Sequence, residues 1–106
     1  RKAKKTDPVR IATLKRMPCI ICYSYGMTQK TMTTVHHCKS GRYSQAKAPD
    51  SATLPLCDCH HQGMRFDRDQ TKIAFHRSQA EWEMEYGEDT EWLPVVNDMM
   101  HEYEEY

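Results

Sequence analysis

Two clusters of cysteine and histidine constrain this chain more than any other feature of its sequence. The first is Val35-His36-His37-Cys38, and the second is the run from Leu56 to His61, which reads Leu-Cys-Asp-Cys-His-His. A Cys19-x-x-Cys22 pair precedes both clusters. Cysteine and histidine are the side chains that most often bind zinc and related ions in proteins. Folding alone does not need so many of them in 106 residues, so the pattern predicts one structural and one catalytic metal site.

The length of 106 residues is that of a single domain, and its 39% apolar content predicts a modest core that a bound metal ion would stabilise. No apolar run approaches the roughly 18 residues of a membrane-spanning helix, so we expect no membrane partner and a cytoplasmic location. Because the sequence begins with Arg1 rather than Met, we expect a further segment to precede it.

The cysteines favour zinc over other uses. Five is an odd number for a disulfide framework, and Cys-x-x-Cys beside Cys/His clusters more often binds zinc in a reducing cytosol. Pro18 before the pair and Gly26 after it suit a zinc-knuckle turn better than a redox motif. A thiol enzyme that uses Cys19 ranks last, because no basic residue is placed to activate that thiol.

A structural zinc ion takes four ligands in a tetrahedron, commonly as two pairs that are each separated by two residues. Cys19 and Cys22 form one pair, and Cys57 with His60 can form the second. Cys59 could substitute as a ligand, and Cys38 is then a spare or part of another site. The alternative for these last two cysteines is that they are buried thiols acting as small apolar side chains.

The remaining histidines fit a hydrolytic centre. Adjacent residues of a strand point to opposite faces, so one histidine of His36-His37 can bind a metal while the other faces a substrate. Phosphodiester hydrolysis needs a base that activates water and a cation that stabilises the developing negative charge. His36 and His61 as ligands, with His37 as base, meet both needs. The alternative is that one histidine of each pair is a structural residue.

The zero net charge hides an uneven distribution. Residues 1–47 carry eleven Lys and Arg against one acidic residue, Asp7, whereas the remainder carries four basic and fourteen acidic residues. A basic half is typical of proteins that bind the phosphate backbone of nucleic acids, with an affinity that falls steeply with salt. The alternative is a pair of solvated faces that attract each other across the fold. We favour nucleic acid, because the cysteine and histidine clusters point the same way.

Capping and turn signals divide the chain into short elements. Asp7 and Pro8 predict the start of a helix that ends at Pro18, and Ser78 and Gly87 predict the two ends of another. The other expected elements are a basic disordered or tethering segment at 2–5, a turn at 19–22, strands at 31–37 and 54–56, a loop at 39–51, a short helix from 60 to about 64 or 66, a turn at 67–71 and a last helix from Thr90 to about Tyr106.

Three motifs resemble those of a known family: Cys19-Ile-Ile-Cys22, Val35-His36-His37, and the run from Leu54 to His61. They are similar to HNH endonucleases of the ββα-metal class and, more closely, to bacteriophage recombination-enhancement nucleases that depend on RecA filaments. The similarity covers residues 18–87, including Thr71-Lys-Ile-Ala-Phe-His76. The double histidine after Pro-Leu-Cys is fairly specific, whereas Cys-x-x-Cys alone is not.

The resemblance implies an α+β fold with a small ββα-metal (HNH) core, a structural zinc knuckle and flanking helices. Residues 1–17 would form a basic N-terminal arm and helix, and residues 18–106 the nuclease domain with C-terminal helices. It also implies that His36 and His61 bind a catalytic divalent ion, Mg²⁺ or another, and that His37 is the general base. His76 is expected as a third ligand or as a group that orients the substrate.

The implied substrate is DNA held in a RecA-type recombinase filament, cut in one strand or both by a monomer in the host bacterial cytosol. The middle Asn of the HNH motif has no clear counterpart, since no Asn occurs before Asn97, and Asp50 is the nearest substitute. The alternative function is a zinc-stapled module that binds DNA or a recombinase without catalysis. The additional histidines argue against it, because a zinc staple does not need them.

Overall fold

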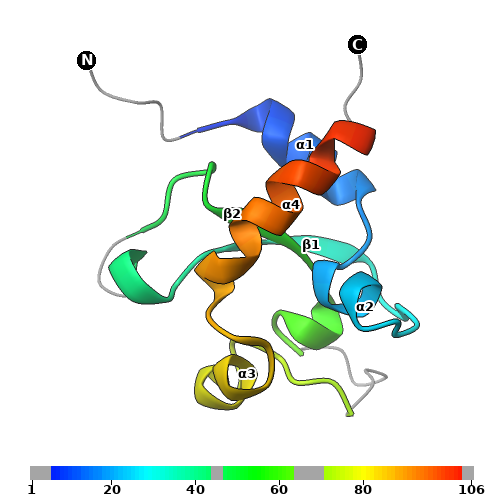
Figure 1. Cartoon of the computed structure of the whole chain (residues 1–106), viewed down its shortest axis with the longest axis vertical. Coiled ribbons are helices and arrows are strands. Elements are labelled where there is room, and N and C mark those ends of the chain that lie inside the picture. Colours follow the sequence, from blue (N-terminus) through cyan, green and yellow to red (C-terminus); the bar gives the residue numbers. More distant parts are fainter. Residues whose placement is uncertain (1–5, 44–46, 64–70, 104–106) are drawn as a thin grey trace.

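The computed structural model describes residues 6–43, 47–63 and 71–103, and it shows an antiparallel pair of strands surrounded by helices (Figure 1). The elements are α1 (Pro8–Arg16), α2 (Ile20–Ser24), β1 (Thr33–His37), β2 (Thr53–Cys57), α3 (Gln79–Tyr86) and α4 (Leu93–Met99), with short 3₁₀ turns between several of them. Val35 lies opposite Pro55 and His37 opposite Thr53. This architecture confirms the α+β fold class and the two expected strands.

The core forms around β2, which is buried at every one of its positions. A two-stranded sheet is not stable alone in water, and here α1, α2 and α4 all contact β2. In Figure 1, α4 crosses in front of the strands, while α1 and α3 lie at opposite ends of the molecule. The largest fully buried side chains are those of Trp82, Phe75, Leu14, Met17, Ile20, Ile21, Leu54 and Leu56.

Two helices have the ends that the capping signals predict. The N–H of Arg10 donates to the Asp7 carboxylate at 3.1 Å, and Pro8 occupies the first turn of α1, where its missing N–H costs nothing. Helix α3 ends at Gly87, whose φ of +88° is left-handed and favours glycine. Ser78 stands at the N-cap position of α3, although its side chain makes no capping hydrogen bond.

Buried Arg10 ties three elements together. Its Nε donates to Thr53 Oγ1 at 2.8 Å and its Nη2 to the Thr53 carbonyl at 2.8 Å. Its Nη1 donates to Asn97 Oδ1 at 2.7 Å. These hydrogen bonds fix α1 against β2 and α4, because Thr53 lies in β2 and Asn97 in α4.

Residues 19–22 were expected as a turn, but they begin helix α2 instead. Residues three apart along a helix lie on one face. The helical conformation therefore brings Cys19, at the N-cap, and Cys22 to the same side of the chain.

The prediction of a helix that starts at His60 is wrong for the residues that the structure describes. A 3₁₀ turn spans Asp58–His60, and the N–H groups of His61 and Gly63 both donate to the Asp58 carbonyl, at 3.1 and 2.7 Å. Gly63 then takes φ +62°, which ends any helical path at little cost for glycine. The rest of that helix, most of the expected turn at 67–71 and the basic segment at 2–5 lie outside the described residues.

The last helix is interrupted and begins later than expected. A 3₁₀ turn at Asp89–Trp92 comes first, then α4, then a 3₁₀ turn at Met100–Glu102. Thr90 is not an N-cap, because it lies inside the first 3₁₀ turn, whose N-cap is Glu88, and the N-cap of α4 is Trp92. Residues 104–106, the expected end of this helix, lie outside the described part.

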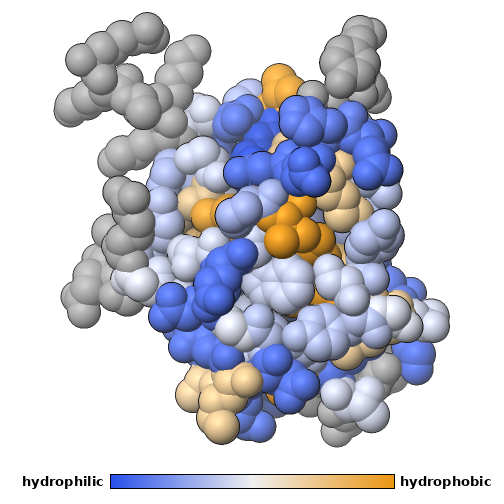
Figure 2. Space-filling view, in the orientation of Figure 1, coloured by the Kyte–Doolittle hydropathy of each residue, from blue (hydrophilic) through white to orange (hydrophobic). Residues whose placement is uncertain are grey.

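Polar side chains cover most of the face that α4 crosses, with a small apolar area near its middle (Figure 2). Within the described ranges, no helix combines the length and the apolar character that crossing a membrane requires.

Candidate metal centres

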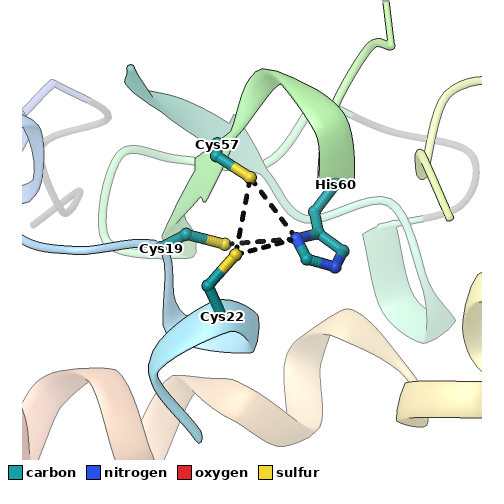
Figure 3. Close-up of side chains that lie close together, drawn as sticks. All are labelled: Cys19, Cys22, Cys57 and His60. Atoms are coloured by element: carbon teal, nitrogen blue, oxygen red, sulfur yellow. Dashed lines mark hydrogen bonds between the residues drawn. The ribbon is translucent and has the colours of Figure 1, made fainter. Parts of the chain in front are cut away.

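Four buried metal-binding side chains converge at the end of β2 (Figure 3). Cys19 and Cys22 come from the start of α2, Cys57 ends β2, and His60 closes the 3₁₀ turn that follows. The Nδ1 atom of His60 lies 3.5 Å from Cys19 Sγ, 3.5 Å from Cys22 Sγ and 3.4 Å from Cys57 Sγ. The sulfurs of Cys22 and Cys57 are 3.8 Å apart.

These distances are those of a tetrahedron around zinc. With Zn–S near 2.3 Å and Zn–N near 2.0 Å, two sulfur ligands lie about 3.8 Å apart, and sulfur and nitrogen ligands about 3.5 Å apart. The group could therefore hold a metal ion, and zinc fits it. The four side chains are those expected from the sequence, whereas Cys38 and Cys59 are buried outside this group.

Two polar side chains surround the Cys₃His group. Lys72 Nζ donates to Cys22 Sγ at 3.3 Å and also to the Thr28 carbonyl. Hydrogen bonds from Cys19 and Cys57, and then that from Lys72, lower the pKa of Cys22. Tyr86 Oη lies 3.4 Å from His60 Nε2, on the ring edge away from the sulfurs, and burial raises the pKa of Tyr86 to about 12. These contacts hold the ligands in place from outside the group.

A second group consists of three imidazoles, those of His36, His61 and His76, whose nearest ring nitrogens lie within 4.8 Å of one another. The ring centroids are 5.1 Å apart for His36 and His61, 5.5 Å for His36 and His76, and 4.9 Å for His61 and His76. His36 and His61 are buried, whereas His76 is exposed. The group is therefore open to solvent on the His76 side.

The tautomer of His36 follows from its partner. Its Nε2 lies 2.8 Å from Asp89 Oδ2, and Asp89 also accepts the N–H groups of Lys39 at 2.7 Å and Ser40 at 3.2 Å. Burial alone would raise the pKa of Asp89, but the hydrogen bonds from His36 and the two backbone groups outweigh it and lower that pKa. The carboxylate only accepts, so Nε2 of His36 carries a proton. Among the described residues, His36 Nδ1 is a buried atom with no partner.

The tautomer of His61 follows in the same way. The Thr34 hydroxyl donates to the Leu56 carbonyl at 2.7 Å, so it can only accept from His61 Nδ1, which lies 2.8 Å away. The lone pair of His61 is then on Nε2. Burial, and then the neighbouring His36 and His76, lower the pKa of His61 to about 3. A neutral imidazole with a free lone pair is the form that binds a metal ion.

His37 lies outside this group, although the sequence analysis expected it to act there. Its Nε2 is 2.9 Å from Asp50 Oδ1, and Asp50 Oδ2 accepts the N–H of Asp7 at 2.8 Å. The hydrogen bond from His37 lowers the pKa of Asp50. The charge of His37 also opposes protonation of His61. His37 is thus close to the three-histidine group while pairing with a carboxylate of its own.

The family model for "Recombination enhancement, RecA-dependent nuclease" matches residues 3–101. The chain belongs to this family. No curated protein and no solved structure gives a significant match. Membership in a family of RecA-dependent nucleases supports an enzyme that acts in recombination and relates the chain to DNA and RecA. It confirms the resemblance inferred from the Cys-x-x-Cys pair and the two double-histidine motifs.

The family match reaches well beyond the second double histidine, into the segment that carries Asp89. Asp89, Thr34 and Lys72 all contact candidate ligands but were not predicted from the sequence. Asp50 was predicted as the nearest substitute for the HNH asparagine, and its carboxylate contacts His37. No local pattern marks the other three, because their partners lie far away along the chain.

Proposed function

We propose that this chain is a metal-dependent DNA endonuclease of the HNH type that hydrolyses phosphodiester bonds in DNA bound by RecA filaments. The observation that carries the proposal is the convergence of His36, His61 and His76, with a free lone pair on His61 Nε2 and an unpartnered Nδ1 on His36. The protein acts as a monomer in the bacterial cytosol, without a membrane partner.

Zinc is the structural ion of this proposal, held by Cys19, Cys22, Cys57 and His60. The tetrahedral distances and the burial of all four side chains support it. A Cys₃His zinc site has no open position and therefore stabilises the fold rather than binding substrate. It would link α2 to the end of β2 and to the turn that carries His61.

A second divalent ion at His36, His61 and His76 would stabilise the negative charge that develops on the scissile phosphate. The residues fit such an ion, because each of the three imidazoles offers a ring nitrogen and these nitrogens lie within 4.8 Å of one another. Imidazole suits Zn²⁺, Ni²⁺ and similar transition ions, whereas Mg²⁺ prefers oxygen ligands. We therefore place a transition ion here ahead of Mg²⁺.

His37 is the general base of the proposed reaction. Its Nε2 faces the Asp50 carboxylate, which accepts a hydrogen bond from the N–H at that position. The other ring nitrogen, Nδ1, is then left to take a proton from water. Its side chain is 35% exposed, so water and substrate can reach it. Asp50 then orients the ring, the role that the asparagine has in the HNH motif.

DNA binding draws on the basic half of the chain. Lys15, Lys30, Lys39 and Lys47 are exposed, and the charge of Lys39 acts on His76. Lys39 lies two residues after the end of β1, so it can contact a phosphate beside the three-histidine group. Acidic residues are concentrated elsewhere, from Glu81 onward.

The test is a cleavage assay on DNA with and without RecA filaments, in the presence of added divalent ion. We expect cleavage that requires the filaments, and a rate that falls by about 10²–10⁴-fold in His37→Ala. His101→Ala is the matched control, because His101 is exposed and lies outside both metal groups. Cleavage by His37→Ala at the wild-type rate would reject the base assignment. DNA binding without any cleavage by the wild type would favour the non-catalytic binding module.

A further inference from the structure

We propose that Asp89 is a positioning residue of the three-histidine centre, whose carboxylate fixes His36 so that Nδ1 rather than Nε2 binds the ion. The proposal rests on the proposed function, because it concerns the ion held by His36, His61 and His76. It assigns a role to the C-terminal segment, which lies outside the two strands that carry the histidine motifs.

The first observation is the contact between the two side chains. Both are fully buried, and His36 Nε2 lies 2.8 Å from Asp89 Oδ2. The carboxylate is itself held by the backbone N–H groups of Lys39 and Ser40, which follow β1 closely along the chain. Its position is thus tied to the strand that carries His36, and the imidazole cannot rotate without breaking this arrangement.

The second observation is independent of the first. His36 Nδ1 is buried with no hydrogen-bond partner among the described residues, and His36 offers one ring nitrogen to the group that it forms with His61 and His76. Buried polar atoms of native proteins nearly always have a partner. A metal ion bound at Nδ1 would supply one, since the proton of the neutral ring is held on Nε2 by Asp89.

A carboxylate behind a metal-binding histidine has a known physical effect. It fixes the tautomer and the ring orientation and raises the basicity of the coordinating nitrogen, and its loss typically costs about 10–100-fold in metal affinity. The rival role for Asp89 is structural only: it would merely accept the two N–H groups of the turn after β1. In a variant that still folds, the positioning role predicts a weaker metal affinity, whereas the structural role predicts an unchanged one.

The experiment measures Co²⁺ binding to the zinc-loaded full chain by calorimetry, with absorption spectroscopy to confirm that no cobalt–thiolate band appears. Asp89→Asn keeps the side-chain shape and should weaken Co²⁺ binding by about 10–100-fold. Asp98→Asn is the matched control, because Asp98 is an exposed carboxylate outside both metal groups. It should leave the Co²⁺ affinity within about twofold, since the carboxylate that it removes belongs to neither group.

Equal Co²⁺ affinity in Asp89→Asn and wild type would overturn the proposal, even if Asp89→Asn melts at a lower temperature. If Asp89→Asn does not fold, long-range ¹H–¹⁵N NMR of the wild type decides. The proposal expects the His36 proton on Nε2 and a metal-induced shift at Nδ1, and it fails if the shift is at Nε2. If the wild type cuts DNA and binds Co²⁺ no more tightly than Asp89→Asn, only the role of Asp89 is rejected. If the wild type neither binds Co²⁺ at the histidines nor cuts DNA, the proposed function is rejected as well.

Discussion

His36 and His37 are neighbours in β1, yet each faces a different carboxylate. His36 contacts Asp89, 53 residues away, and His37 contacts Asp50, 13 residues away. Alternation along the strand separates the two rings, so one can bind an ion while the other takes a proton. In the proposed mechanism a single dipeptide supplies two chemical roles, and the carboxylates beside its two rings come from two different segments.

At His61, we predict a neutral ring with its proton on Nδ1 at pH 5, in protein whose three-histidine centre has no added ion. Burial lowers the pKa of His61 to about 3, below the value of about 6.5 of an unfolded chain. The unfolded chain therefore binds a proton first, and stability is lost as the pH falls from 6.5 toward 3. Long-range ¹H–¹⁵N NMR measures both protonation and tautomer. A ring that titrates near pH 6.5 would contradict the effect of burial on the pKa, and a neutral ring with its proton on Nε2 would contradict the hydrogen bond to Thr34.

At Lys72, we predict that Lys72→Met speeds zinc loss by about tenfold. Three thiolates and one neutral imidazole leave a zinc site with a net negative charge, and buried Lys72 donates to one of those sulfurs. The measurement is the rate of zinc transfer to a coloured chelator. Lys15→Met, at an exposed position of α1, is the control and should release zinc at the wild-type rate. Equal rates in the two variants would remove Lys72 from the zinc site.

At the scale of elements, Arg10 joins α1, β2 and α4. We predict that Arg10→Met lowers the free energy of unfolding by about 2–4 kcal/mol, because it leaves the Thr53 carbonyl and Asn97 without their buried donor. Denaturant unfolding of the zinc-loaded protein measures this loss. Lys15→Met should change the same quantity by less than about 0.5 kcal/mol. A similar small change in Arg10→Met would mean that α1 is held by apolar packing alone.

Elements with a local signal could be predicted from the sequence, and those shaped by distant contacts could not. The Asp7-Pro8 start of α1, the Gly87 end of α3 and both strands follow from capping, turn and alternation patterns. Helix α2 and the turn after Cys57 were not predicted, because their conformations depend on contacts among four side chains that are distant in the sequence. The interruption at Asp89 was missed for a related reason, since its side chain is drawn inward by His36.

The same division holds for the candidate site. Ligand types and spacing predicted the Cys19, Cys22, Cys57 and His60 group and the pairing of His36 with His61, and the family resemblance added His76; the structure brings the members of each group close together. The residues that set the tautomers and charges of these ligands could not be predicted. Their hydrogen-bond partners lie dozens of residues away, and such pairs produce no local pattern in the sequence. Only Asp50 could be suggested, from its position relative to the HNH motif.

At the scale of the whole molecule, the two metal groups share one short turn, since His60 faces the sulfurs and His61 faces His36 and His76. We predict that removing zinc with a chelator lowers the melting temperature by well over about 10 °C, since structural zinc contributes several kcal/mol to small domains. It should also abolish ion binding at the three histidines, because their geometry depends on that turn. Circular dichroism and calorimetry measure the two effects. Retained Co²⁺ binding at the histidines after zinc loss would show that the groups are independent.

The most direct measurement is the rate at which zinc-loaded protein cuts DNA in RecA filaments as a transition ion is added, compared between His76→Ala and His101→Ala. Both histidines are exposed, so neither change should unfold the protein, but only His76 belongs to the three-histidine group. We predict that His76→Ala loses about 10²-fold in rate, or needs far more of the ion, while His101→Ala cuts like the wild type. Cleavage by His76→Ala at the wild-type rate and the wild-type ion concentration would contradict a catalytic ion held by His36, His61 and His76.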